Sequence, residues 1–91
     1  MTIKECVRIN GLQSEVSGSL KRYQTVDVGF VNSDGKDDET QFDVRNVFRK
    51  EGIEELSQLF SCFCKENGFQ SNTVSSITIV RCGDSLEELE T

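Results

Sequence analysis

The sequence predicts an α+β fold in which a small antiparallel sheet of three or four strands, in the order β-β-β-α-β, packs one main helix on one face. Residues 52–68 repeat apolar side chains with the 3.6-residue period of a helix. Residues 22–31, 40–46 and 73–82 show the alternating or β-branched pattern of strands. A length of 91 residues fits a single acidic domain, 1–91.

The first segment, residues 2–9, alternates weakly and predicts a strand, although Glu5 interrupts its apolar side. The Asn10-Gly11 pair is typical of a turn and is expected to end this strand. Residues 12–21 scatter isolated apolar side chains among Ser and Gly, and therefore predict a loop.

Residues 22–31 and 40–46 predict a β-hairpin, because each has an apolar side and a polar side. A two-residue turn at Asp34-Gly35 would bring Val28 opposite Gln41 and would place the two apolar sides on opposite sheet faces. We therefore expect a longer, odd-length acidic loop, or an Asp-Gly turn followed by a bulge. One such register pairs Phe30 with Phe42 and Val28 with Val44.

The main helix, residues 52–68, offers an apolar stripe that can cover a sheet face. Asn46 is expected to cap its N-terminus, which would place Val47 and Phe48 in the first turn, although Gly52 weakens the continuity. The stripe consists of Ile53, Leu56, Leu59, Phe60 and Phe63, with Cys64 beside them.

The end of this helix is marked more clearly than its start. Gly68 fits the left-handed position after the last turn, and Phe69 fits the apolar residue that folds back onto the helix. Lys65 complements the negative end of the helix dipole.

The last strand, residues 73–82, has apolar side chains on both faces, which indicates an interior strand or an edge covered by a partner. Residues 83–91 form an acidic tail in which Ser85 and Glu88 have capping-box spacing. A short terminal helix is expected there only if it docks on the domain.

Charge is unevenly distributed along the chain. The net charge is −6, and residues 32–91 alone hold 13 acidic against 6 basic side chains, a net of −7. Such a surface opposes direct contact with nucleic acid or with an anionic membrane, since both require Lys and Arg. It favours attraction to a basic protein surface, or serves solubility alone.

Three acidic clusters are the candidate partner-binding residues, if the fold brings them onto one side. They lie in the hairpin loop, at the helix start and in the tail, and a continuous acidic stripe can enter a groove built for a phosphate backbone. The candidates are Asp34, Asp37, Asp38, Glu39, Glu51, Glu54, Glu55, Asp84, Glu87 and Glu88.

In size and charge the chain is similar to small inhibitors of nucleic-acid-handling enzymes, such as the anti-CRISPR and anti-restriction proteins of phages and mobile elements. The similarity is one of class: no motif is shared, and it assigns no residue. It implies a non-catalytic inhibitor acting by nucleic-acid mimicry. The alternative is an assembly subunit that homodimerises through a sheet edge, with the strand at 73–82 pairing with its own copy.

Catalysis, metals and cofactors are not expected. There is no histidine, hence no common general base, and no glycine loop with phosphate-binding spacing. Cys62 and Cys64 would point to nearly opposite sides of a helix, about 200° apart, so we interpret them as small apolar residues rather than zinc ligands. The acidic loop could attract calcium, but its spacing is not that of an EF-hand.

The expected location is the cytoplasm. The N-terminus lacks the apolar core of a signal peptide, and no stretch has the length and apolarity of a membrane span. In a reducing compartment the four cysteines remain thiols.

Overall fold

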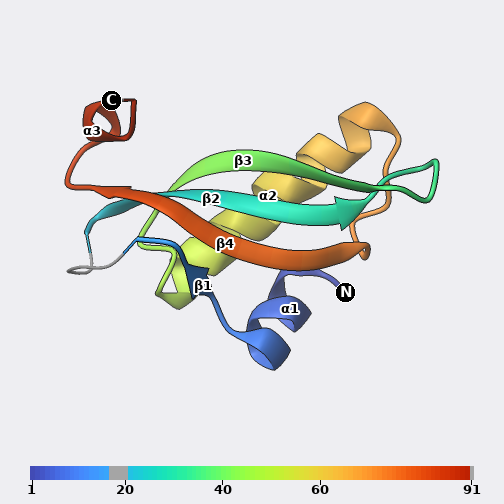
Figure 1. Cartoon of the computed structure of the whole chain (residues 1–91), viewed down its shortest axis with the longest axis horizontal. Helices are drawn as coiled ribbons and strands as arrows, with labels where there is room; N and C mark the ends of the chain where they lie inside the picture. The colour runs from blue at the N-terminus through green and yellow to red at the C-terminus, as the bar shows by residue number, and fades with distance from the viewer. Residues whose placement is uncertain (17–20, 91) are drawn as a thin grey trace.

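The fold is a four-stranded sheet covered on one face by helices, which confirms the α+β class. A computed structural model describes residues 1–16 and 21–90. In Figure 1 the long helix crosses behind the sheet, the hairpin turns at one end and the last helix lies at the other. The elements are α1 Ile3–Asn10, β1 Gln13–Ser14, β2 Tyr23–Val31, β3 Asp37–Arg45, α2 Lys50–Asn67, β4 Val74–Gly83 and α3 Leu86–Leu89.

The sheet has the strand order β1-β4-β2-β3. β4 is an interior strand, as its two apolar faces indicated, and pairs antiparallel with β2 and parallel with β1. The sheet is therefore mixed, and the prediction of a purely antiparallel sheet was wrong. The parallel strand is only two residues long and lies in the segment 12–21 that we expected to be a loop. Residues 17–20 of that segment lie outside the described residues.

The prediction of a first strand at residues 2–9 was wrong, because this segment is helix α1. Thr2 and Glu5 form a capping box: the Thr2 hydroxyl accepts from the Glu5 N–H, and the Glu5 carboxylate accepts from the Thr2 N–H. Ile3 and Cys6 lie three residues apart and enter the core beside α2 and β4. Weak alternation had concealed this helical spacing.

The β2–β3 hairpin has the expected kind of turn and a different register. Three residues, 33–35, form the loop; the Asn32 carbonyl accepts from the Gly35 N–H, and Gly35 has φ +75°. The odd loop length puts the apolar residues of both strands on one face, as argued. The pairs, however, are Val26 with Phe42 and Gln24 with Val44, so the Phe30–Phe42 register was wrong.

Helix α2 begins later than the proposed Asn46 cap. Asn46 has a left-handed φ of 56°, and its N–H donates to the Arg22 carbonyl, which extends the hairpin. The turn that follows approaches the helix so closely that a Cβ on Gly52 would collide with the Asn46 carbonyl. The helix therefore starts at Lys50, after the N-cap residue Arg49, whose side chain forms no cap hydrogen bond.

The end of α2 confirms the sequence interpretation. Gly68 has a left-handed φ of 72° and its N–H donates to the Cys64 carbonyl, as does that of Phe69. Lys65 lies in the last turn. The Phe69 ring returns to within 5.4 Å of the Phe30 ring, centroid to centroid, which closes the core near the hairpin.

The core lies between the sheet and the helices α1 and α2. Leu56, Phe60 and Cys64 of α2 are buried against Val26, Val28 and Phe30 of β2 and against the facing residues of β3 and β4. Phe30 and Phe60 meet edge to face, with their ring centroids 5.6 Å apart. This packing occupies the whole apolar stripe of α2, so only its outer side is available to solvent or to a partner.

The acidic tail forms the short helix α3. Leu89 is 2% exposed, and α3 contacts β4 and β2. The side chain of Glu88 accepts from the Asp84 N–H at 2.8 Å, which closes the turn before the helix. Docking through Leu89 explains how a helix of four residues persists.

Candidate functional site

The sheet face turned away from α2 is polar, and it is open except where α3 docks on it. Since side chains alternate along a strand, the residues between the core positions of β2 and β3 point to this side. In β3 residues 37–39 are all exposed, and from Glu39 onward the exposed residues come at every second position. We call the carboxylates of this side the acidic sheet face; its members are Asp27 of β2 and Asp37, Glu39 and Asp43 of β3.

Asp27 is the most informative member of this surface. Its oxygen Oδ1 is buried and has no hydrogen-bond partner among the described residues. Asp27 pairs with Gln41 of β3 and with Thr78 of β4, so it lies in the middle of the sheet. A buried polar atom without a partner costs about 1–3 kcal/mol. A donor or cation brought by another molecule would remove that cost.

Asp43 differs from Asp27 because it is used within the fold. The hydroxyl of Thr25, which is 2% exposed, donates to the Asp43 Oδ1 at 2.6 Å. Near these two residues Leu89 and Arg81 border a shallow depression. The Arg81 guanidinium is 3.5 Å from the Gln41 side-chain oxygen. The hairpin half of the face is thus acidic, whereas its other half contains cations and the docked helix α3.

Strand β3 also presents a free edge. It is the last strand of the sheet and pairs only with β2 within the described residues. The Glu39 N–H donates to the Asp38 Oδ1 at 2.8 Å, and the other outer N–H and C=O groups of this edge can accept another strand. Charged side chains on an edge strand discourage pairing with an identical strand, and β3 has four acidic residues against one Arg.

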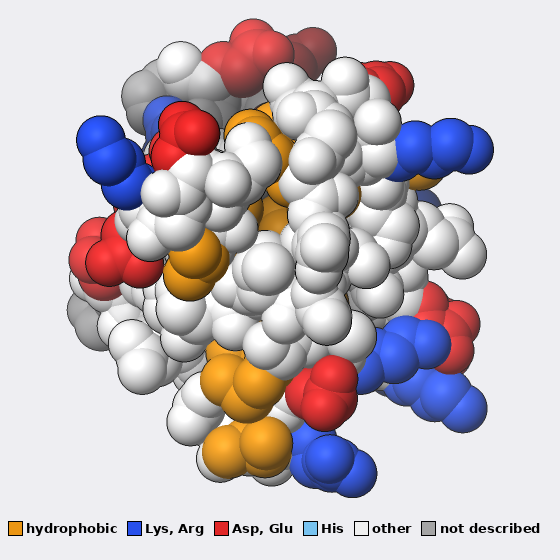
Figure 2. Space-filling view, turned by 90° about the vertical axis from the view of Figure 1, so that its right-hand side faces the viewer, with side chains coloured by type: hydrophobic (Ala, Val, Ile, Leu, Met, Phe, Trp, Pro, Cys, Tyr) orange, Lys and Arg blue, Asp and Glu red, His pale blue; other side chains and the backbone are white. Residues whose placement is uncertain are grey.

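The three predicted acidic clusters do not meet on one surface. Asp34 lies in the hairpin turn, and Asp37, Asp38 and Glu39 begin β3. Nine strand residues, roughly 27 Å at the usual rise, separate this end of the sheet from the end at Arg45. Figure 2, which looks onto the hairpin end, shows acidic side chains at separate places on the rim with Lys and Arg between them.

The helix and tail clusters lie elsewhere. Glu51, Glu54 and Glu55 are exposed on α2, which covers the opposite sheet face. Asp84, Glu87 and Glu88 belong to the segment of α3, at the end of the sheet opposite the hairpin. The stripe that the sequence suggested is therefore divided among two faces and two ends.

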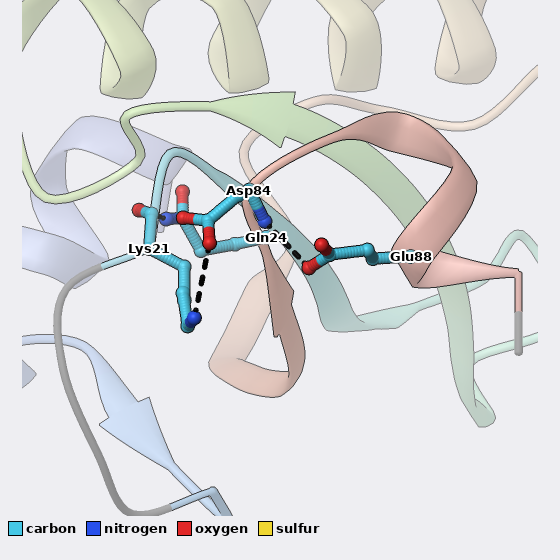
Figure 3. Close-up of polar contacts among 4 residues, drawn as sticks. All are labelled: Lys21, Gln24, Asp84 and Glu88. Carbon is cyan, nitrogen blue, oxygen red and sulfur yellow. Dashed lines mark hydrogen bonds and ion pairs between the residues drawn. The ribbon is translucent and has the colours of Figure 1, made fainter.

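Two of the tail carboxylates have partners within the chain. Asp84 forms an ion pair with Lys21 at 3.1 Å, and its N–H donates to Glu88, as Figure 3 shows. The hydrogen bond to Asp84 raises the pKa of Lys21. These groups hold α3 and the start of β2 together.

Sequence reasoning missed Asp27 and Asp43 as candidates. The signal was present in the alternation, which placed both residues on the polar sides of their strands. Neither residue belongs to a run of acidic residues, so charge clustering along the sequence does not identify them. Only the β2–β3 pairing brings them onto the same side of the sheet.

The cysteines lie as the helical geometry predicted. Cys62 is exposed and Cys64 is buried, on opposite sides of α2, and all four cysteines are free thiols. Burial raises the pKa of the Cys64 and Cys82 thiols, which lowers their reactivity. Among residues 1–16 and 21–90, no three His, Cys, Asp or Glu side chains are placed to hold a metal ion.

No helix in the described part of the chain has both the length and the apolarity needed to cross a membrane. Comparisons with family profiles, with characterised proteins and with solved structures find no match for this chain. Its chemistry must therefore be argued from the surfaces described above.

Proposed function

We propose that this protein is a non-catalytic binding module that engages a basic protein surface through the acidic sheet face and the free edge of β3. The unpartnered oxygen of Asp27 is the observation that carries the proposal. Asp27 is half-buried and one of its carboxylate oxygens is unsatisfied, so it gains from a Lys, an Arg or a backbone N–H supplied from outside. The neighbouring carboxylates would add attraction to the same cation-rich partner.

The edge of β3 suggests how such a partner would be held. An extended basic segment can add as a fifth strand, with main-chain hydrogen bonds supplying affinity. Side chains of an added strand alternate every second residue, about 6.8 Å apart, which is also the spacing of Asp37 and Glu39. Lys or Arg at alternate positions would therefore face the acidic side of the sheet.

In its sharpest form the proposal makes this protein an inhibitor of a nucleic-acid-handling enzyme, of the anti-CRISPR or anti-restriction kind, encoded by a phage or mobile element. The carboxylates would occupy sites that normally take phosphates. Such a protein would act in the cytoplasm, where its four thiols stay reduced. Assays of restriction and CRISPR effector nucleases with and without the protein test this form. Salt-sensitive inhibition that requires Asp27 would support it.

The homodimer alternative is less favoured by the charge of β3. Its nine residues have a net charge of −3, because four are acidic and one is Arg. Two copies of this strand side by side would repel each other, whereas a basic strand would be attracted. β4 pairs with β2 along one side, and on its other side β1 covers it at Thr78 and Ile79. Light scattering at low and high salt separates the two ideas: a dimer that forms at low salt would favour self-association.

Binding can be measured with a defined probe, a nonapeptide of alternating Lys and Thr. We expect salt-sensitive binding to the protein. Replacing three acidic side chains, Asp27→Asn, Asp37→Asn and Glu39→Gln, should weaken it at least about tenfold, since each surface ion pair is worth roughly 0.5 kcal/mol.

The matched control neutralises three exposed carboxylates of α2, Glu54→Gln, Glu55→Gln and Glu66→Gln. It removes the same charge from the other side of the molecule and should leave peptide binding within about twofold. Equal losses in both triple variants, or binding that does not respond to salt, would contradict the proposal. Circular dichroism establishes that both variants are folded.

A further inference from the structure

The end of the sheet opposite the hairpin has a second surface of different chemistry. A shallow depression of about 520 Å³ lies there, bordered by Lys21, Arg22, Asn46, Phe48, Arg49 and Asp84. Its volume falls in the range of small-molecule sites. Three of the six bordering residues are cations, in a chain whose net charge is −6.

A buried side chain, Gln24, joins the two backbone segments that border this depression. Gln24 is 0% exposed; its amide oxygen accepts from the Val47 N–H at 2.8 Å, and its amide nitrogen donates to the Lys21 carbonyl. The Asn46 N–H donates to the Arg22 carbonyl at 2.9 Å. The backbone on both sides of the depression is thus joined by hydrogen bonds, so the site is formed before any ligand binds.

The two arginines are available to a ligand. Lys21 is neutralised by its ion pair with Asp84, which Figure 3 shows. The guanidinium groups of Arg22 and Arg49 form no ion pair or hydrogen bond with any described residue, and both residues are exposed. Two guanidinium groups beside one depression match a phosphate group, because each can donate two parallel hydrogen bonds.

Phe48 supplies an apolar surface at the same place. It is 42% exposed, although every other Phe of the chain is buried or half-buried. An aromatic ring left in solvent beside cations suits a planar ring that can stack on it. A ligand that joins a phosphate to a planar heterocycle uses all of these features at once.

We propose that this depression binds a nucleotide, with Arg22 and Arg49 on the phosphate and Phe48 against the base. The net charge of −6 opposes a long polyanion, so a free mononucleotide is the favoured source of this chemistry over the end of a nucleic-acid chain. The site does not depend on the acidic sheet face and would hold even if that proposed function failed.

The test is a titration followed by ¹⁵N–¹H NMR, with adenosine 5′-monophosphate, adenosine, inorganic phosphate and a short 5′-phosphorylated oligonucleotide as probes. We expect the mononucleotide to shift the amides of Arg22 and of residues 46–49 in a saturable way. Adenosine and phosphate alone should bind more weakly. An oligonucleotide that binds far more tightly than the mononucleotide would identify a nucleic-acid terminus as the source.

Three variants make the test specific. Arg22→Gln with Arg49→Gln should weaken mononucleotide binding at least about tenfold. Phe48→Leu should weaken it about fivefold and leave phosphate binding unchanged. The control pair, Arg8→Gln with Lys65→Gln, removes the same charge from exposed positions outside the depression and should have no effect.

The spectra of the free variants establish that each is folded. The proposal is overturned if no probe gives saturable shifts around Arg22 and Phe48, or if the control pair weakens binding as much as the arginine pair does. Loss of peptide binding to the acidic sheet face has no bearing on this result.

Discussion

Two polar residues on opposite faces of β2, Gln24 and Asp27, differ in whether the chain satisfies their buried atoms. On the covered face Gln24 is completely buried, and both its amide oxygen and its amide nitrogen have partners within the chain. On the open face Asp27 has a buried oxygen that no described residue satisfies. A polar group in a core is stable only when the chain supplies its partners. An unsatisfied group beside an open surface can be satisfied by another molecule, and our proposal that this face binds a partner rests on that difference.

The largest effect should come from the covered face. Phe60 is 1% exposed and packs edge to face against Phe30, so Phe60→Ala should lower the free energy of unfolding by about 3–5 kcal/mol. Glu39→Gln, an exposed change on the open face, should stay within about 0.5 kcal/mol. Urea denaturation measures both. Similar losses in the two variants would show that the faces do not divide stability and binding between them.

Variants of Gln24 and Asp27 should differ in their free energy of unfolding by an intermediate amount. Gln24→Leu leaves the buried N–H of Val47 without its acceptor, which should cost about 1–3 kcal/mol. Asp27→Asn removes a charge whose Oδ1 has no partner among the described residues, and should be neutral or slightly stabilising while weakening binding of a basic peptide. A large loss of stability in Asp27→Asn would mean that this carboxylate serves the fold and would count against its role in binding.

The smallest expected effect is on the stability of the protein at acid pH, and it comes from Glu5 of α1, outside the sheet. Hydrogen bonding by the backbone N–H of Thr2 lowers the pKa of Glu5 below its ordinary value of 4.5. A lowered folded-state pKa gives stability that is present above the unfolded-state value and is lost as the pH falls through the folded-state value.

Glu5→Gln tests this dependence, because the amide can still accept a hydrogen bond but does not titrate. The wild-type protein should exceed this variant in Tm near neutral pH, and the difference should vanish well below pH 4.5. A difference that persists in acid would exclude the carboxylate of Glu5 as its source. Glu66→Gln, an exposed change on α2, is the matched control.

Local patterns determined much of the fold. The strand alternation at residues 22–31, the period of α2 and its Gly68 stop were each visible in a short window, because they depend on side-chain spacing and on a left-handed backbone position. The odd number of residues in the hairpin loop was also predictable, because only an odd number puts the apolar residues of both strands on one sheet face. The particular register could not be predicted, as it depends on how many residues the turn uses.

The failures share one physical cause. Residues 2–9 have both the weak alternation of a strand and the Thr2–Glu5 capping box of a helix. The segment is helical because Ile3 and Cys6 then pack against α2 and β4. Asn46 has a good N-cap side chain, yet the close approach of its turn to Gly52 gave it a left-handed conformation instead. For residues 2–9 contacts distant in sequence outweighed a local preference, and for Asn46 a close approach six residues along the chain did so.

The fold class, the main helix, the long strands and the acidic character of the chain follow from local spacing and charge, which are visible in the sequence. The positions of the charges depend on tertiary contacts. Strand pairing brought Asp27 beside the acidic residues of β3, and it separated the hairpin, helix and tail clusters that seemed one group in sequence. Burial and unmet hydrogen bonds arise from neighbours that only folding assembles, so the surfaces that we propose for binding could not be located from the sequence.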